Sequence, residues 1–598
     1  MRTPTGTATP RDANPAHAAS AELFAALADA GVAQVCVCPG SRSAPLAIAA
    51  AQTPGLRVWT QIDERAAAFF ALGLAKTSRM PVALVCTSGS AAANLLPAVV
   101  EARYSGVPLV LLTADRPPEL RGVGAGQTID QTRLFGSHVR WFAEAALPEP
   151  GAATLRHFRS LAERALAQAL GPPAGPVHLN LPFREPLEPA GPLAGAAAPE
   201  PRALAGPRLE RRAAPPAEAE IDALCRLARE RERGVLACGP LDLRPGAAAA
   251  IARFAQLAGW PLLADPLSQL RCGAWTAEAP VIASSDLLLR DADFAARHAA
   301  ELVLRIGASP TSKALRLWLE GHPPDELVLI DPERERHDPS GLATRVWHCD
   351  PELLCAAASE RLAGPPPRRS PHWLASWRRA ESQAALALDE AFADDAALLE
   401  PNAVRALADE LPDGALLVVS NSMAVRELDA FLPASRRALR VLGNRGASGI
   451  DGLVSTALGC AAARAGATLL LTGDLAFLHD AGGLLAAHRH ALSLAVVVLD
   501  NDGGGIFSYL PIAAQAERVH FEELFRTPHG LDLAPIAAAY GATAVRIGSL
   551  AHLRSALKDA LVRAGVTLLV VPVDRDRSVE AFRARAAAVA AATSRERR

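Results

Sequence analysis

The sequence is poor in aromatic residues, has almost no net charge and contains no long hydrophobic run. Phe, Trp and Tyr together make up 5% of the 598 residues. Ala is abundant, so we expect helices to pack closely through small side chains. A formal net charge of −2 gives no electrostatic argument for binding nucleic acid or an anionic membrane. No apolar run reaches the ~18 residues of a membrane span. Any anionic ligand must therefore be held by locally placed arginines.

Cysteine is also scarce. The nine cysteines are odd in number and form no CxxC pair, which excludes a disulfide framework and a zinc-ribbon pattern. Several of them lie in apolar runs, so we expect buried thiols in a cytoplasmic protein. The first 20 residues lack the apolar segment of a signal peptide and are expected to form a polar leader.

Half of the residues are hydrophobic, and a prior of ~150 residues per domain gives three or four domains. Apolar runs without alternation, typical of strands buried on both faces, are separated by helical segments. This pattern predicts the α/β class with three doubly wound parallel-sheet domains. The expected domains are 18–190, 215–364 and 373–598, separated by segments rich in Pro, Ala and Gly at 188–218 and 364–367.

The strands expected from the apolar runs are 34–38, 58–61, 81–86, 108–113 and 177–181 in the first block, 234–238, 261–264, 302–306, 327–330 and 346–349 in the second, and 416–419, 440–442, 469–471, 495–499, 543–547 and 568–571 in the third. The first and third blocks have a similar size and rhythm, which suggests a duplication. No GxGxxG opens a helix in the middle block, so no dinucleotide-binding fingerprint is present.

Two polar residues follow neighbouring strands of the third block. Asp474 comes after one strand, and Asn501, 27 residues later, comes after the next. Carboxylate and amide oxygens suit Mg²⁺, and the carboxyl ends of parallel strands meet at the edge where ligands bind. The alternative is that both residues only cap turns. An EF-hand loop starting at Asp500 is a worse fit, because its twelfth position would be Pro511 rather than a bidentate Glu.

Glu64 is the most distinctive residue of the first block. It follows a strand and opens the helical segment RAAAFFALGLAK, with Asp63 as the expected N-cap. One interpretation is a first-turn acid that serves the helix dipole. The other is a partly desolvated functional acid with a perturbed pKa, favoured by the apolar surroundings.

Five motifs occur together and in order: PGSRS at 39–43, DER at 63–65, TADRPPEL at 113–120, NRGASGIDG at 444–452 and GGGIF at 503–507. With Asp474 and Asn501, this combination resembles the 2-succinyl-5-enolpyruvyl-6-hydroxy-3-cyclohexene-1-carboxylate synthases, a family of thiamine-diphosphate enzymes of menaquinone biosynthesis. Each motif is weak alone, and the five in register are specific. The resemblance covers nearly the whole chain.

The resemblance implies a pyrimidine-binding first domain and a diphosphate-binding third domain. The active site would lie between the first domain of one subunit and the third of another, so a homodimer is the minimum and a homotetramer is expected. Glu64 would hydrogen-bond the aminopyrimidine ring of thiamine diphosphate and favour its imino tautomer, which deprotonates the thiazolium. Mg²⁺ or Mn²⁺ would be held by Asp474, Asn501 and the carbonyl of Gly503. The other cofactor contacts implied are Ser422, Ile450, Leu475, Ala476 and Ile506.

The family reaction is decarboxylation of 2-oxoglutarate followed by addition of the succinyl carbanion equivalent to isochorismate. The four carboxylates of these substrates call for arginines, because guanidinium binds carboxylate bidentately. For any single arginine a surface salt bridge is the alternative. The implied substrate-binding residues are Ser41, Arg42, Arg116, Gln127, Lys313, Ser422, Arg426 and Arg445, with an apolar wall of Ile506, Phe507 and Leu510.

The chain departs from the family pattern at several positions. Asp500 and Asp502 stand where Asn is often found, and we expect both carboxylates to face away from the metal, since an inward one would repel diphosphate. Ala314 follows Lys313 where some relatives have a second cation, and Gly126 precedes Gln127 where a polar residue is common. The nearby histidines do not have metal-ligand spacing and are expected to be solvated or core residues: His479, His488, His490, His520 and His529.

Two other functions remain open from the sequence. One is another 2-oxo-acid decarboxylase or carboligase of the acetolactate synthase type, which would use pyruvate. The other is a non-enzymatic scaffold with this fold, which would show no thermal shift with thiamine diphosphate and Mg²⁺. The joint presence of Glu64, Asp474 and Asn501 argues against the scaffold.

Overall fold

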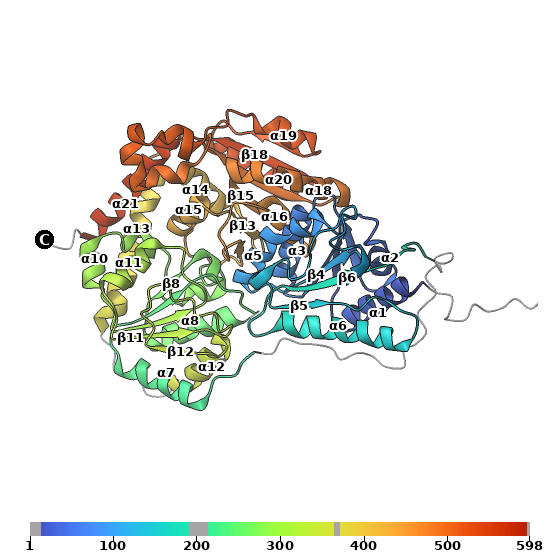
Figure 1. Cartoon of the computed structure of the whole chain (residues 1–598). Coiled ribbons are helices and arrows are strands. Elements are labelled where there is room, and N and C mark those ends of the chain that lie inside the picture. Colours follow the sequence, from blue (N-terminus) through green and yellow to red (C-terminus); the bar gives the residue numbers. More distant parts are fainter. Residues whose placement is uncertain (1–13, 190–212, 245, 364–370, 595–598) are drawn as a thin grey trace, which may run out of the picture. The chain divides into compact units, whose positions relative to one another are not determined.

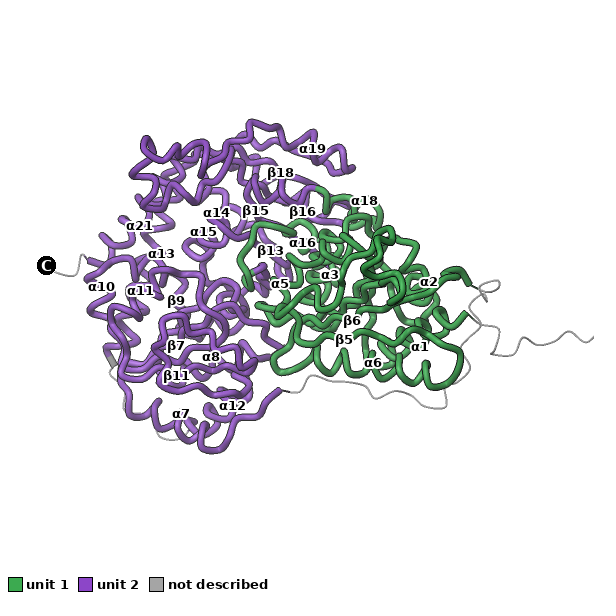
Figure 2. The backbone as a smooth tube through the Cα atoms, in the orientation of Figure 1, with its two compact units in different colours: residues 1–211, 445–465, 482–492 green, residues 212–444, 466–481, 493–598 purple. Residues whose placement is uncertain are grey.

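The computed structural model describes residues 14–189, 213–244, 246–363 and 371–594 (Figure 1). The chain divides into two compact units (Figure 2). Unit 1 comprises residues 1–211, 445–465 and 482–492, and unit 2 comprises residues 212–444, 466–481 and 493–598. Most of the expected separators, and residues 1–13 of the expected leader, lie outside the described residues. Residues 15–20 of that leader are helical, which corrects the expectation for this part.

Unit 1 is built on a six-stranded parallel sheet in the order β2-β1-β3-β4-β6-β5. Its strands are β1 (Gln34–Val37), β2 (Arg57–Thr60), β3 (Val82–Cys86), β4 (Leu109–Asp115), β5 (Trp141–Glu144) and β6 (Val177–Pro182). Its helices of the first block are α1 (Pro15–Asp29), α2 (Ala44–Gln52), α3 (Glu64–Ser78), α4 (Ser90–Ala93), α5 (Leu96–Ser105) and α6 (Ala152–Leu170), and α16 (Leu453–Ala462) and α18 (Leu484–His490) also belong to this unit. Strands β3 and β4 are buried along their whole length, and β4 carries the buried polar residues Thr113 and Asp115 near its carboxyl end.

Helices α3 and α16 pack backbone against backbone at glycines. A Cβ added to Gly73 would lie 2.0 Å from the carbonyl oxygen of Thr456, and one added to Gly459 would lie 2.1 Å from that of Phe70. Real Cβ atoms do not approach so closely, so each position requires glycine. This pair of helices confirms the expectation of close helix packing through small residues.

Unit 2 contains two further parallel sheets. The middle sheet has the order β12-β11-β10-β7-β8-β9, and the third has the order β14-β13-β15-β16-β18-β17. The middle strands are β7 (Gly234–Cys238), β8 (Leu262–Ala264), β9 (Val281–Ile282), β10 (Leu302–Ile306), β11 (Glu326–Ile330) and β12 (Arg345–Trp347). The third sheet consists of β13 (Leu416–Val419), β14 (Arg440–Gly443), β15 (Thr468–Gly473), β16 (Leu494–Asp500), β17 (Thr543–Arg546) and β18 (Val566–Pro572).

The α-helices of unit 2 connect these strands and cover the sheets. They are α7 (Glu218–Glu230), α8 (Ala247–Ala258), α9 (Ser285–Leu288), α10 (Ala292–Arg297), α11 (Lys313–Gly321), α12 (Pro351–Leu362), α13 (Pro371–Ala393), α14 (Glu400–Glu410), α15 (Met423–Phe431), α17 (Asp474–His479), α19 (Leu533–Ala539), α20 (Leu550–Val562) and α21 (Arg575–Ser594). None of the helices in the described part of the chain has the length and apolar character needed to cross a membrane.

The first and third sheets have the same topology. When the strands of each sheet are numbered along the chain, both read 2-1-3-4-6-5, as the suggested duplication requires. The middle sheet instead reverses its order between β7 and β10, as in dinucleotide-binding folds. There the loops after β7 and β10 touch, because a Cβ on Gly239 would lie 1.9 Å from the carbonyl oxygen of Ala308.

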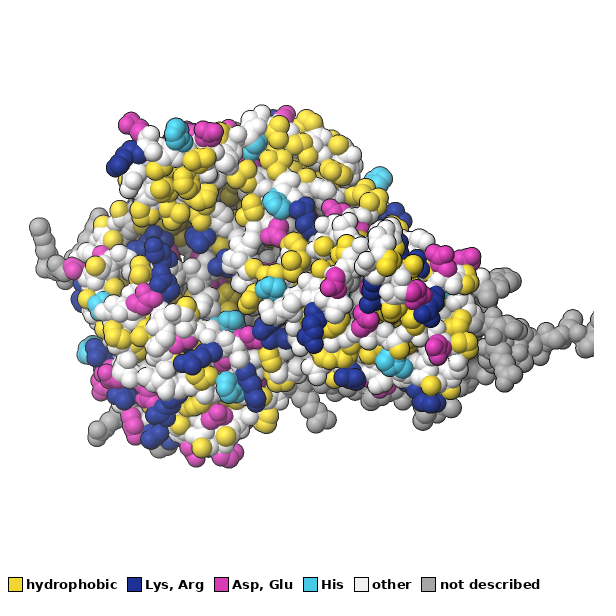
Figure 3. Space-filling model, in the orientation of Figure 1, with side chains coloured by type: hydrophobic (Ala, Val, Ile, Leu, Met, Phe, Trp, Pro, Cys, Tyr) yellow, Lys and Arg dark blue, Asp and Glu magenta, His cyan; other side chains and the backbone are white. Residues whose placement is uncertain are grey.

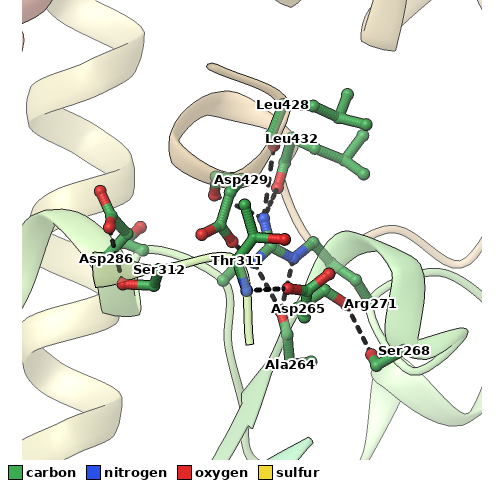
Figure 4. Close-up of polar contacts among 12 residues, drawn as sticks. Ala264, Asp265, Ser268, Arg271, Asp286, Thr311, Ser312, Leu428, Asp429 and Leu432 are labelled. Atoms are coloured by element: carbon green, nitrogen blue, oxygen red, sulfur yellow. Dashed lines mark hydrogen bonds and ion pairs between the residues drawn. The ribbon is translucent and has the colours of Figure 1, made fainter. Parts of the chain in front are cut away.

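The middle and third sheets of unit 2 are joined by a buried arginine (Figure 4). The guanidinium of Arg271, 1% exposed, donates to the carbonyl oxygens of Ala264 and Asp429 and pairs with the Asp429 carboxylate at 2.8 Å. Nearby, Asp265 accepts from the backbone N–H of Thr311 at 2.7 Å. The buried guanidinium thus meets a carboxylate and several carbonyls, which offsets its desolvation.

The strand predictions are confirmed in position: three of them match the observed strands at both ends, and the others differ by one or two residues at an end. Two strands were missed. β5 is a half-exposed edge strand without an apolar run, and β9 is only two residues long. All nine cysteines are free and buried, as expected. On the face seen in Figure 3, charged side chains of both signs are interspersed with apolar ones.

Candidate active site

The third sheet presents a polar edge where β15 and β16 end. These strands are neighbours in parallel register, so Asp474, directly after β15, and Asn501, directly after β16, emerge at the same edge. The buried Asp474 carboxylate accepts from the backbone N–H of Leu475 at 2.6 Å through Oδ1 and from that of Gly503 at 2.8 Å through Oδ2. The Gly503 contact ties the two strand ends together.

Asn501 carries an unsatisfied acceptor. Its Oδ1 is buried without a hydrogen-bond partner, whereas its Nδ2 donates to Glu400 at 2.5 Å. The carbonyl of Gly503 accepts one bond, from the N–H of Gly505 at 3.0 Å, which leaves a second lone pair. A buried amide oxygen without a donor is costly unless it meets a cation or a donor. The oxygen atoms of Asp474, Asn501 and Gly503 therefore fit a hard divalent cation.

The loop after β16 has glycines where other residues could not fit. Gly503 has φ of +136°, and a Cβ there would lie 2.1 Å from the carbonyl oxygen of Arg526. That carbonyl also accepts from the N–H of Gly504 at 2.7 Å. The turn ending at Arg526 thus braces the loop, a contact that the sequence pattern did not reveal.

His529 and Asp500 correct two expectations. His529 Nε2 lies 3.4 Å from Asp474 Oδ2 and 3.8 Å from Asp500 Oδ1. The ligand atoms of these three residues all lie within 4.8 Å of one another. Asp500 therefore faces the Asp474 carboxylate instead of facing away, and His529 belongs to a possible metal-binding group. Asp502 is different, since its half-exposed carboxylate accepts from the N–H groups of His529 and Gly530.

The electrostatics of this edge favour a cation. Burial raises the pKa of Asp474, and the charge of Asp500 adds to the increase, while the N–H groups of Gly503 and Leu475 oppose it. Burial likewise raises the pKa of Asp500. A divalent cation would stabilise both carboxylates in their charged forms.

In unit 1, Glu64 is the first residue of α3 and is half-buried. The N-cap is Asp63, as expected, and its carboxylate accepts from the N–H groups of Arg65 at 2.8 Å and Ala66 at 3.1 Å. Asp63 satisfies these donors, so Glu64 is not the cap, and it lies in the first turn, where an acid also interacts with the helix dipole.

Two predicted substrate residues of unit 1 meet around Ser88. The Arg116 guanidinium donates to the Ser88 hydroxyl and, at 3.1 Å, to the carbonyl of Gly126. Gln127, which has φ of +55°, donates to the Ser88 carbonyl at 3.0 Å. The Gly126 contact with Arg116 uses only the backbone carbonyl, and a Cβ at Gly126 would meet nothing within 4 Å, so this contact does not depend on glycine.

Arg42 lies near Arg116. Burial first, and then the charge of Arg42, lower the pKa of Arg116. Arg42 is itself 6% exposed and donates to the carbonyl of Phe183 at 2.9 Å and to the exposed carboxylate of Glu185 at 3.2 Å. Two neighbouring guanidinium groups attract an anion. Ser41, which precedes Arg42 in the chain, is exposed.

The loop that carries Arg445 and Ile450 is held by Glu101, a residue not predicted. The buried Glu101 carboxylate accepts from the N–H groups of Gly446 at 2.9 Å and Ala447 at 2.7 Å and pairs with Lys76 at 3.3 Å. These contacts fix the loop within unit 1. No local sequence signal identifies Glu101, because it is 345 residues from Gly446.

The other predicted substrate and cofactor residues lie in unit 2. Ser422 precedes α15 with φ of +65° and ψ of −131°, and its carbonyl accepts from Arg426 at 2.5 Å. Such strained backbone is concentrated at functional sites. Ile506 and Phe507 form a short 3₁₀ turn, and Leu510, 40% exposed, follows it.

Lys313 is exposed at the start of α11, whereas Ala314 is buried in the hydrophobic core of the middle sheet. The Ala314 position faces apolar neighbours, so a second cation there would be buried. Leu475 and Ala476 occupy the first turn of α17 after Asp474.

The comparisons with known proteins match the three-sheet architecture. The family described as "Thiamine pyrophosphate enzyme, N-terminal TPP binding domain" matches residues 18–134, the middle domain of thiamine pyrophosphate enzymes matches 212–419, and the C-terminal TPP binding domain matches 427–571. A solved structure of benzoylformate decarboxylase from Polynucleobacter necessarius superposes with a TM-score of 0.67 at 18% identity, covering 93% of this chain and 98% of that one. The fold is that of a thiamine-pyrophosphate enzyme.

More similar relatives identify the family within this class. The 2-succinyl-5-enolpyruvyl-6-hydroxy-3-cyclohexene-1-carboxylate synthase of Myxococcus xanthus is 46% identical over 94% of this chain and 95% of its own. The protein of the same name from Chloroflexus aurantiacus is 45% identical over 94% of each chain. The chain belongs to the family of 2-succinyl-5-enolpyruvyl-6-hydroxy-3-cyclohexene-1-carboxylate synthases, which confirms the resemblance found in the sequence.

Proposed function

We propose that this enzyme decarboxylates 2-oxoglutarate and adds the succinyl carbanion equivalent to isochorismate, with release of CO₂, in menaquinone biosynthesis. The family relationship supports the reaction. The observation that carries the proposal is the buried Asn501 Oδ1, which has no hydrogen-bond partner, at the strand edge shared with Asp474. A hard cation there would anchor a diphosphate.

Different residues of this chain would bind the metal, contact the aminopyrimidine ring and orient the cofactor. When bound, thiamine diphosphate supplies the carbon nucleophile and accepts the electron pair that the departing CO₂ leaves behind. Asp474, Asn501 and the carbonyl of Gly503 would hold Mg²⁺ or Mn²⁺. Glu64 would hold a proton at the aminopyrimidine ring. Ser422, Ile450, Leu475, Ala476 and Ile506 would orient the cofactor.

The substrates would be gripped by cationic and polar side chains. Arg42 and Arg116, whose charges already repel each other, would gain from a shared carboxylate. Arg42 would then exchange its contact with the exposed Glu185 for the substrate. The other proposed contacts are Ser41, Gln127, Lys313, Ser422, Arg426 and Arg445, and Ile506, Phe507 and Leu510 would form the apolar wall that excludes water.

We also propose the domain roles and the assembly. Residues 18–190 would bind the pyrimidine, residues 215–364 form the middle domain, and residues 373–598 would bind the diphosphate. Glu64 of one chain would serve the Asp474 edge of another, so the enzyme would be a homodimer at least and is expected to be a homotetramer. A cytoplasmic location fits the nine free, buried thiols.

Product analysis tests this function. The purified enzyme with thiamine diphosphate and Mg²⁺ should form the carbon–carbon bond only when both 2-oxoglutarate and isochorismate are present. Use of pyruvate instead would favour an acetolactate-type reaction. Absence of a thermal shift on adding thiamine diphosphate and Mg²⁺ would contradict the cofactor assignment.

The role of Glu64 has a matched control in the adjacent residue. Glu64→Gln should lose nearly all turnover while still binding thiamine diphosphate in a Mg²⁺-dependent manner, because it removes the proton-holding group and leaves the metal edge intact. Asp63→Asn removes the same charge one residue away and keeps a good N-cap, so it should retain turnover. Full activity of Glu64→Gln would overturn the assignment.

A further inference from the structure

Two buried glutamates lie beside the polar edge of the third sheet that carries Asp474 and Asn501, and the proposed function gives neither of them a role. Glu400 is the first residue of α14 and is 3% exposed, and Glu427 in α15 is fully buried. Glu400 Oε1 accepts from Asn501 Nδ2 at 2.5 Å. Burying a carboxylate costs folding free energy, so the presence of two of them beside a proposed metal ligand calls for an explanation.

The contact with Glu400 determines which way the Asn501 amide points. An Asn side chain has a donor side, Nδ2, and an acceptor side, Oδ1, and a carboxylate oxygen only accepts. Glu400 therefore selects the orientation in which Nδ2 faces it, and a flip by 180° would place Oδ1 against the carboxylate. In the selected orientation, Oδ1 is the buried atom without a partner.

A second buried carboxyl group, that of Glu427, neighbours Glu400. Burial first, and then the charge of Glu400, raise the pKa of Glu427. Among the described residues, neither oxygen of Glu427 has a partner that would donate a hydrogen bond to it. A proton carried by Glu427 and donated to Glu400 satisfies the pair and leaves Glu400 Oε1 as the acceptor for Asn501. The backbone N–H of Glu400 also donates to the Ser578 hydroxyl at 3.2 Å.

We propose that Glu400 is a positioning residue that fixes the Asn501 amide with Oδ1 toward the metal, and that Glu427 buttresses it. This inference rests on the metal site of the proposed function. It assigns Glu400 a function through Asn501 alone, with no contact to metal, cofactor or substrate. Partners that orient metal ligands typically change metal affinity by about 10–100-fold when they are removed.

The test compares two substitutions of Glu400 that differ in whether the new side chain can accept a hydrogen bond from Asn501. In Glu400→Met the acceptor is lost, whereas in Glu400→Gln an amide oxygen can still accept from Asn501 while its NH₂ donates to Glu427. The measurement is the Mg²⁺ dependence of thermal stabilisation at saturating thiamine diphosphate, together with direct Mn²⁺ binding by electron paramagnetic resonance. Glu410→Gln, at the other end of the same helix, where the carboxylate pairs with Arg554 and Lys558, is the matched control.

We expect Glu400→Met to raise the Mg²⁺ and Mn²⁺ concentrations for half-saturation by about 10–100-fold, Glu400→Gln to remain within about threefold of the wild type, and Glu410→Gln to match it. A purely structural role would lower the cofactor-free melting temperature of Glu400→Met without moving the metal dependence, and that result would overturn the proposal. A wild type without any metal dependence would instead overturn the metal site itself, so the two failures are distinguishable.

A reversed hydrogen bond provides a second test that does not depend on the folding of Glu400→Met. Asn501→Asp places a carboxylate oxygen against Glu400 and should weaken metal binding despite the added negative charge. Combining Asn501→Asp with Glu400→Gln lets the glutamine NH₂ donate to the new carboxylate, so metal affinity should recover by at least tenfold over Asn501→Asp alone. No recovery in the double variant would contradict the inference.

Discussion

Acid should destabilise unit 1 through a single buried histidine. His178 in β6 is fully buried, between the rings of Phe135 and Phe142 at centroid distances of 4.7 and 5.1 Å. The Thr113 hydroxyl donates its only hydrogen to Asn180 at 3.0 Å, so His178 Nε2, 2.7 Å from that hydroxyl, must be the donor. His178 Nδ1 is then a bare acceptor, and it is buried without a partner. A proton added at Nδ1 would have no acceptor.

The magnitude follows from the pKa of this imidazole. Burial lowers the pKa of His178 from 6.5 to about 3. Between these two values the unfolded chain binds a proton that the folded chain does not, so the free energy of unfolding decreases as the pH falls below 6.5. Between pH 8 and pH 5, the titration of His178 alone therefore lowers the free energy of unfolding by about 2 kcal/mol.

Urea unfolding of the wild type and His178→Gln at pH 8, 6.5 and 5 measures this loss, with circular dichroism as the probe. Glutamine cannot titrate, and its amide can still donate to Thr113. The variant should be less stable than the wild type at pH 8, because it fills the site between the rings poorly, and the difference should shrink by about 2 kcal/mol at pH 5. Parallel pH dependence of the two proteins would refute the reasoning.

Two further experiments test the buried Arg271–Asp429 pair and the glycine contact between α3 and α16. Arg271→Met should destabilise unit 2 by ~3–5 kcal/mol, because the buried Asp429 carboxylate loses its partner, and adding Asp429→Leu should restore much of the loss in urea unfolding. Gly459→Ala should lower the thermal stability of unit 1 by about 1–3 kcal/mol, because its Cβ would meet the backbone of Phe70. Gly548→Ala, where a Cβ meets nothing within 4 Å, should change stability by less than ~0.5 kcal/mol.

The sequence predicted those features that depend on local patterns. Apolar runs without alternation placed sixteen of the eighteen strands, because strands of parallel sheets are buried on both faces. The N-cap at Asp63 was also predictable from a local pattern, because its carboxylate accepts from the N–H groups of residues only two and three positions away. The edge strand β5 escaped because its half-exposed residues leave no apolar run.

The residues that support the site could not be predicted in this way. Glu400 meets Asn501 across 101 residues, and His529 meets Asp474 across 55. Neither partner carries a periodic or spacing signal, because the fold alone brings them together. The candidate ligands Asp474 and Asn501 could be predicted, because each directly follows a strand and neighbouring parallel strands end at one edge.

The position of Asp500 shows where the chemical argument went wrong. We expected its carboxylate to face away because we gave the repulsion of a diphosphate more weight than the tighter binding of Mg²⁺ or Mn²⁺ that an inward carboxylate would give. Asp500 closes the β16–β18 pairing opposite Pro572, and its carboxylate lies with Asp474 and His529. With a divalent cation present, a second carboxylate at this distance adds attraction to the cation as well as repulsion of the diphosphate. Whether Asp500 strengthens or weakens cofactor binding therefore depends on the cation, and Asp500→Asn, which restores the residue common in the family, should change the Mg²⁺ dependence of thiamine diphosphate binding more than it changes the stability of the cofactor-free protein.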